Sequence, residues 1–157
     1  MRRQKLDKTD LKILKKLQEN GRATNVELAE YAGISAPPCL RRVRGLEEAN
    51  IIRGYNADIN PGSLGYGIQV MTQVKLESNR DLDIRKFELQ IQEWDCVREC
   101  YLLSGDIDYL LKIVAKDWDS YQHFLTTQLA AMNNVASVKT SPIVRTAKAL
   151  RGVPIEV

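Results

Sequence analysis

The segment TNVELAEYAGISAPPCLRRVRGLEE, residues 24–48, constrains the fold most strongly, because it predicts two short helices joined by a tight turn. Thr24 and Glu27 match the S/T-x-x-E capping box that begins a helix. Gly33 stands where the end of that helix needs a residue that tolerates positive φ. Ser35 can cap the second helix, and the two prolines that follow fall in its first turn, where a missing N–H costs little.

The second helix of this pair is amphipathic and basic. Cys39, Val43 and Leu46 recur on one helical face and point inward, whereas its arginines lie mostly off that face. Arginine suits DNA because its planar guanidinium matches a phosphate or a guanine edge with two hydrogen bonds. The alternative is a basic face that is simply solvated. Because such a helix pair fits the major groove, the predicted DNA-binding residues are Ser35, Ala36, Pro37, Pro38, Cys39, Arg41, Arg42 and Arg44.

Charge and composition agree with a nucleic-acid module joined to a more neutral part. The chain has 157 residues, enough for one ordinary domain or two small ones. Residues 1–66 hold twelve Lys and Arg against eight Asp and Glu, whereas residues 67–157 hold eleven against twelve. No apolar run approaches the roughly 18–20 residues of a membrane span, and no secretory signal is recognisable. With only three cysteines and no disulfide framework, we expect a cytoplasmic protein without a membrane partner.

Turn-forming residues divide the chain. Residues 60–63, Asn-Pro-Gly-Ser, form the clearest predicted break between domains. We therefore predict a DNA-binding domain over 1–60 and a second domain over 61–157. The first domain should also contain a helix from Asp7 to about Asn20, and a wing or linker strand over 51–59. Asn50 is expected to take the place of a glycine after the last helix of this domain.

The second half alternates between strand and helix patterns. The predicted elements are strand 67–77, helix 82–94, strands 97–103 and 107–115, helix 118–132 and strand 135–147. This β-α-β-β-α-β order is ferredoxin-like, so the predicted fold class is α+β, with a helix-turn-helix domain before a ferredoxin-like domain. Two helices would cover one sheet face. The other face is expected to be too apolar to remain exposed to solvent, because it carries Met71, Leu102, Leu110 and Val114. This favours a second copy of the chain that covers it.

The motif SGDIDY, residues 104–109, is the second candidate site. A glycine turn between two strands exposes backbone N–H groups that can hold a carboxylate, and an aspartate can pair with an ammonium group. These are the two ends of a free amino acid. The alternative is an ordinary hairpin in which Asp caps the turn. The effector-binding candidates in this motif are Ser104, Gly105, Asp106, Asp108 and Tyr109.

In its segments and their spacing, the chain resembles the Lrp/AsnC family of bacterial and archaeal transcription regulators over nearly its whole length. One departure is Asn50, where the family usually has glycine. The segments that carry the resemblance are LDKTDLKILKKLQENGR at 6–22, ELAEYAGIS at 27–35, LRRVRGLE at 40–47, IIRGY at 51–55, SGDIDYLLKI at 104–113 and SVKTSPIVRTAK at 137–148.

The resemblance implies an N-terminal helix-turn-helix, a ferredoxin-like effector domain, and dimers that often assemble into larger rings. It adds Thr140 and Ser141, on the last strand, to the expected effector-binding residues. We therefore expect a sequence-specific transcription regulator rather than an enzyme. It should bind double-stranded DNA as a homodimer, tetramer or octamer, take a small effector such as an amino acid, and use no cofactor or metal.

Two alternative functions stay open. Siroheme decarboxylases resemble this chain in domain order but have lost DNA binding; the arginines of the second helix and the single histidine, His123, argue against that chemistry. A modulator that forms mixed dimers without reading DNA is disfavoured by the intact helix-turn-helix. Cys96 and Cys100 lie at the start of a strand without further Cys or His nearby, so we expect them to pack rather than bind metal.

Overall fold

The computed structural model describes residues 5–150 and 152–157, which form two compact units. The helical unit contains the chain up to Asp58 together with the C-terminal segment from Lys148. The sheet unit is Ile59–Ala147. The C-terminal segment thus groups with the helical unit. The division into domains over 1–60 and 61–157 stays a prediction.

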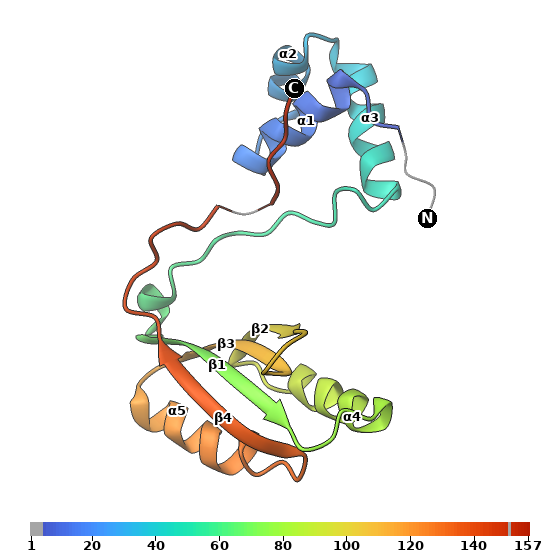
Figure 1. The fold of residues 1–157 in the computed structure, drawn as a ribbon. Coiled ribbons are helices and arrows are strands. Elements are labelled where there is room, and N and C mark those ends of the chain that lie inside the picture. The colour runs from blue at the N-terminus through green and yellow to red at the C-terminus, as the bar shows by residue number, and fades with distance from the viewer. Residues whose placement is uncertain (1–4, 151) are drawn as a thin grey trace. The chain divides into compact units, whose positions relative to one another are not determined.

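The helical unit contains three helices whose ends follow the local sequence signals: α1 (Lys8–Glu19), α2 (Asn25–Ala32) and α3 (Ala36–Glu48) (Figure 1). The predicted starts of α1 and α2 are confirmed, because Asp7 caps α1 and Thr24 forms a reciprocal capping box with Glu27. Ser35 precedes α3 as predicted, but its side chain makes no capping hydrogen bond. Gly33 ends α2 with φ of 75°, and Asn50 follows α3 with φ of 56°, as expected for left-handed positions.

A small apolar core holds the three helices together. Ile13 of α1 and Cys39 of α3 are completely buried, and Leu46 is 2% exposed. Leu28, Ala29 and Ala32 supply the face of α2. The inward face predicted for α3 is therefore confirmed, with Val43 partly buried beside it.

The segment after α3 is not a strand. Residues 53–60, all of them described, have no regular secondary structure and lead into a short 3-10 helix, Pro61–Leu64. The strand predicted over 51–59 is therefore wrong for this chain by itself. The physical reason is that a strand is stabilised by a ladder of hydrogen bonds to a neighbour, and this segment has no neighbouring strand here.

The sheet unit has the predicted β-α-β-β-α-β order. Its elements are β1 (Ile68–Leu76), α4 (Asp81–Gln92), β2 (Val97–Leu102), β3 (Tyr109–Ala115), α5 (Trp118–Phe124) and β4 (Val135–Pro142). A π-helical turn, Leu125–Leu129, extends α5. The strands are antiparallel in the order β2-β3-β1-β4, which confirms the ferredoxin-like arrangement.

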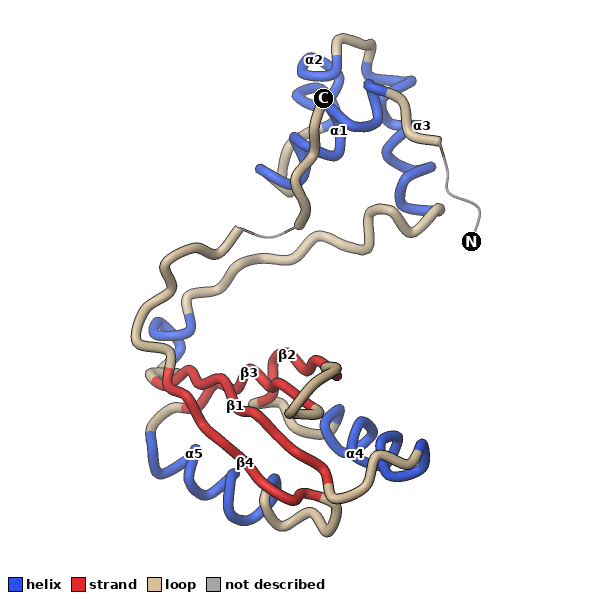
Figure 2. Tube along the Cα trace, viewed as in Figure 1, coloured by secondary structure: helices blue, strands red, loops and turns tan. Residues whose placement is uncertain are grey.

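The two helices of this unit lie against one face of the sheet (Figure 2). Val70 and Val74 of β1 are fully buried there, together with Leu111 of β3. Phe87 of α4 packs on Tyr109 of β3 with ring centroids 4.7 Å apart. Burial of this face accounts for the alternation of apolar residues that the sequence displays along β1 and β3.

The opposite, open face differs from the prediction at one residue. Met71 and Leu110 lie on it as expected, but Leu102 pairs with Tyr109 and so shares the helix-covered side. Tyr101 takes its place on the open face, opposite Leu110. The cause is a register shift between Val97 and Glu99, because a slip of one residue exchanges the two faces of a strand.

Among the described residues, no helix combines the length and the apolar character that crossing a membrane requires.

Candidate DNA-binding surface and effector site

The start of α3 presents small and rigid groups to solvent. Ser35 and Pro37 are exposed, and Ala36 and Pro38 are partly buried. The Ser35 side chain makes no capping hydrogen bond, although the residue occupies the N-cap position. Cys39 is different, because it lies in the core with no exposed surface, and burial raises the pKa of its thiol. Of the predicted DNA-binding residues at this end of α3, all except Cys39 thus have accessible surface.

The three arginines of α3 have different surroundings. Arg41 and Arg44 are exposed and make no hydrogen bond or ion pair with any residue that the structure describes. Arg42 instead donates from Nη1 to Asp7 Oδ2 at 2.8 Å and to Asp10 Oδ1 at 2.7 Å. Two of the three guanidinium groups are therefore available to a ligand, and the third joins α3 to the start of α1.

The contact of Arg42 with the start of α1 stabilises the ionised carboxylate of Asp7. The Asp10 backbone N–H, followed by the Arg42 guanidinium, holds the pKa of Asp7 below its ordinary value. Asp10 Oδ2 also accepts the Asp7 N–H at 3.1 Å, which completes the capping box. Negative charge at a helix N-terminus is favourable, so the same two residues cap α1 and orient Arg42.

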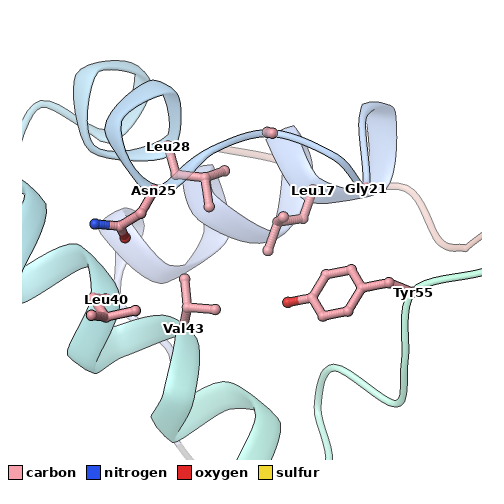
Figure 3. A pocket seen from close by; sticks show the side chains of 8 residues that line it. Leu17, Gly21, Asn25, Leu28, Leu40, Val43 and Tyr55 are labelled. Carbon is pink, nitrogen blue, oxygen red and sulfur yellow. The ribbon is translucent and has the colours of Figure 1, made fainter.

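A pocket of about 180 Å³ is lined by residues of α1, α2, α3 and the start of the linker (Figure 3). Asn25 lines it and donates from Nδ2 to the Ala36 carbonyl at 2.8 Å, which ties α2 to the start of α3. Its buried Oδ1 has no partner among the described residues. The remaining lining residues are Leu17, Gly21, Ala23, Leu28, Leu40, Val43 and Tyr55.

Tyr55 fixes the start of the linker to α3. Its hydroxyl donates to Glu47 Oε1 at 2.9 Å. Burial, followed by the neighbouring Glu47 carboxylate, raises the pKa of Tyr55 to about 12. The sequence assigned no role to this residue beyond membership of the IIRGY segment.

The predicted effector motif forms the connection between β2 and β3. Ser104, Gly105 and Asp106 are all exposed at its tip. Lys75, at the end of β1, donates from Nζ to the Asp106 carbonyl at 3.0 Å. This places an ammonium group beside the turn, a contact that sequence spacing does not reveal because the two residues are 31 positions apart.

Asp108 holds this connection against β1. Its Oδ2 accepts the Leu76 N–H at 2.7 Å, and its Oδ1 accepts from Asn79 Nδ2 at 3.0 Å. Both carboxylate oxygens are therefore used within the protein. Asp108 differs in this respect from Asp106, whose carboxylate makes no hydrogen bond or ion pair within the described part of the chain.

The remaining predicted effector residues do not gather around the turn. Tyr109 is 1% exposed, and its hydroxyl donates to Glu88 Oε1 at 3.1 Å on the helix-covered side. Thr140 lies on the same side, where its hydroxyl contacts Tyr121. Ser141 is on the open face, opposite Met71. Because β1 lies between β3 and β4, one subunit does not bring Thr140 and Ser141 next to the motif.

Tyr121 makes a buried polar contact that the sequence does not indicate. Its hydroxyl lies between two threonines, at 3.2 Å from the fully buried Thr72 and in contact with Thr140. A pocket of about 280 Å³ beside it is lined by Tyr66, Cys96, Ile113, Val114, Ala115, Lys116, Ser120 and Phe124. No cluster of three His, Cys, Asp or Glu suited to a metal occurs among the residues described.

Comparison with known proteins agrees with both halves of this description. A winged helix-turn-helix DNA-binding model matches residues 6–53, and the model of the Lrp/AsnC ligand binding domain matches residues 69–153. The leucine-responsive regulatory protein of Rhizobium meliloti is 47% identical over 146 residues, covering 93% of this chain and 94% of its own. The Bkd operon transcriptional regulator of Pseudomonas aeruginosa is 40% identical, covering 87% and 89%.

Solved structures extend the similarity to the whole fold. A transcriptional regulator of Neisseria meningitidis in complex with L-methionine has a TM-score of 0.90 and 38% identity, covering 96% of this chain and 97% of its own. AsnC of Escherichia coli has a TM-score of 0.85 and 26% identity, covering 96% and 99%. With the exposed arginines of α3 on a helix-turn-helix and a ferredoxin-like domain after it in the chain, the chain belongs to the Lrp/AsnC family of DNA-binding transcriptional regulators.

Proposed function

We propose that the chain regulates transcription as a symmetric homo-oligomer that reads DNA through α3 and responds to an amino acid held at the turn between β2 and β3. The observation that carries the DNA half is the contrast among the arginines of α3. Arg41 and Arg44 extend free guanidinium groups into solvent, while Arg42 is held by α1. Free guanidinium groups on an exposed recognition helix suit phosphate and guanine contacts.

The open face of the sheet supports self-association. Met71, Leu110 and Tyr101 share this face with polar neighbours, among them Lys112, whose Nζ lies 3.0 Å from Glu99 Oε1. An apolar face with polar neighbours suits an isologous contact with a second copy. Two copies related by a twofold axis would present two α3 helices to a pseudo-palindromic site, with half-sites about one helical turn apart, roughly 34–36 Å.

The exposed turn supports the effector half of the proposal. The backbone N–H groups of Gly105 and Asp106 make no hydrogen bond within the described part of the chain and suit a carboxylate, and the Asp106 carboxylate suits an ammonium group. The Neisseria meningitidis regulator is described as a complex with L-methionine, which makes an amino acid the first ligand class to test. An effector changes DNA binding only if it binds one assembly better than another, so ligand and oligomer should be linked.

A titration of DNA fluorescence anisotropy tests the DNA half. The protein should bind its own upstream region more tightly than random DNA of equal length, and affinity should fall steeply between low and physiological salt. An Arg41→Ala, Arg44→Ala double variant should lose most affinity, whereas Lys86→Ala, an exposed change in the sheet unit, serves as the control. Equal affinity for the upstream and random duplexes would contradict the proposal.

Calorimetry against the twenty amino acids tests the effector half. Heat with at least one of them, together with a change in the sedimentation of the oligomer, is the expected result. No heat with any amino acid would remove the effector proposal and leave the DNA-binding proposal standing.

A further inference from the structure

The C-terminal segment of the chain docks on α1 through one side chain. Gln18 Nε2 donates to the Val153 carbonyl at 2.8 Å, and the Val153 N–H donates to Gln18 Oε1 at 3.1 Å. The amide of Gln18 therefore captures both backbone groups of a residue 135 positions away, in the manner of paired strands. This contact lies within the helical unit. In Figure 1 the C-terminal end of the chain, in dark red, lies beside the helices of this unit.

Gly152 fits closely against the same side chain. Its φ is 82°, and a Cβ at this position would lie 2.2 Å from Gln18 Oε1 and 2.4 Å from Gln18 Cδ. Any larger residue would force Gln18 to turn away, which breaks both hydrogen bonds. The left-handed backbone would also be strained for a side-chain-bearing residue.

The contact depends on the backbone more than on apolar burial. The residues Val153 and Val157 are 64% and 52% exposed, and only Ile155 of this segment is partly buried. Removing the Gln18 amide should therefore release residues 152–157 without exposing a core. This makes the contact separable from the stability of the helical unit.

We propose that this contact is a second tether of the DNA-reading unit, made by residues 152–157 of the same chain on α1. The chain passes between the two units twice, at residues 58–59 and again at residues 147–148. Docking at Gln18 fixes the second connection to the first helix. Two fixed connections allow the helical unit fewer orientations than one flexible linker does, and the second begins directly after β4.

Hydrogen exchange in the full-length protein tests the docking. In Gln18→Ala, which keeps a good helix former, the Val153 amide should exchange about threefold to tenfold faster than in the wild type. Gly152→Val should give the same increase. Glu19→Ala, the exposed neighbouring residue, is the matched control and should leave this rate unchanged. A wild-type Val153 rate equal to that of Gln18→Ala would overturn the proposal.

The rotational correlation time of α1, from amide nitrogen relaxation, tests the tether. This correlation time should fall in Gln18→Ala and in Gly152→Val. It should fall no further in the double variant, because both changes break the same contact. An unchanged correlation time in variants with a released tail would overturn the tethering role, as would additive effects. Neither measurement uses DNA or an effector, so the result is independent of the proposed function.

Discussion

Arg42 of α3 donates to Asp10 of α1 at 2.7 Å, so an ion pair between residues 32 positions apart in sequence joins the DNA-reading helix to the first helix. The carboxylate of Asp10 is the better covered partner, with 15% of its side chain exposed against 35% for Arg42. The contact orients α3 on its scaffold. It separates one arginine of this helix, which maintains geometry, from two that are free to bind.

Replacing Arg42 and Arg44 in turn should separate these two roles. Arg42→Ala should lower the free energy of unfolding by up to about 1 kcal/mol, the upper end for a partly exposed ion pair. Arg44→Ala should leave unfolding unchanged but weaken DNA binding by about tenfold, because it removes a contact to phosphate or base. Urea unfolding and anisotropy titration of both variants give the comparison. A loss of stability in Arg44→Ala would contradict the division.

The helical unit should lose stability in acid through Asp7. Its pKa in the folded protein lies below the ordinary value of 3.8, because of the Asp10 N–H and then the Arg42 guanidinium. A depressed folded-state pKa means that the stabilisation is complete above the unfolded-state value. It disappears as the pH falls through the folded-state value.

Asp7→Asn tests this pH dependence, because asparagine also caps helices but does not titrate in this range. The variant should show a smaller fall in urea midpoint between about pH 5 and pH 2 than the wild type does. Glu19→Gln, at the exposed end of α1, is a control for the loss of one negative charge. An identical pH profile in wild type and Asp7→Asn would contradict the assignment.

Two glycines of the helical unit should respond oppositely to the same substitution. Gly33 has φ of 75° with open space around its missing Cβ, so Gly33→Ala should cost about 1 kcal/mol in backbone strain alone. Gly45 lies inside α3 with equally open space, so Gly45→Ala should raise stability by about 0.5–1 kcal/mol. Thermal unfolding of both variants measures the difference. Equal shifts of the two variants would show that the strain argument fails.

Local signals predicted the helical unit well, because caps and glycine positions depend on neighbours in sequence. Asp7, Thr24 and Gly33 each do what their residue type indicates. The pairing of Arg42 with α1 could not be predicted, since it depends on how the helices cross. The docking of Val153 on Gln18 was equally hidden, because nothing in an exposed C-terminal segment indicates its partner.

In the sheet unit, the sequence predicted which elements form better than which way each residue faces. Alternation placed Met71 and Leu110 on the open face, but the register shift in β2 turned Leu102 to the other side. The predicted effector residues follow from one motif and from the family resemblance, but they do not lie together in the sheet unit. Tyr109 is in the core and Thr140 is beyond β1, which is why a complete ligand site requires more than one motif.

The hydroxyl of Tyr121 should contribute measurably to the sheet unit. Tyr121→Phe removes the partner of the fully buried Thr72 hydroxyl, 3.2 Å away, and should lower the free energy of unfolding by about 1–3 kcal/mol. Adding Thr72→Val should recover part of this loss, because the unpaired hydroxyl is then removed. Tyr101→Phe, which removes an exposed hydrogen bond from the hydroxyl to Glu99, is the control. Urea unfolding measures the coupling. A double variant that loses more free energy of unfolding than the two single variants lose together would contradict it.

The two aspartates of the effector motif should separate binding from folding. Asp106→Asn removes an exposed carboxylate, so it should weaken amino-acid binding by at least about tenfold, as expected for loss of a charge-assisted contact, and leave unfolding unchanged. Asp108→Asn disturbs the carboxylate that accepts from Leu76 and Asn79, so it should lower stability by about 1–2 kcal/mol. Calorimetry with the amino acid that binds the wild type, beside urea unfolding, measures both effects. If Asp106→Asn binds as tightly as the wild type, the ammonium group is held elsewhere, and Asp106 drops out of the site.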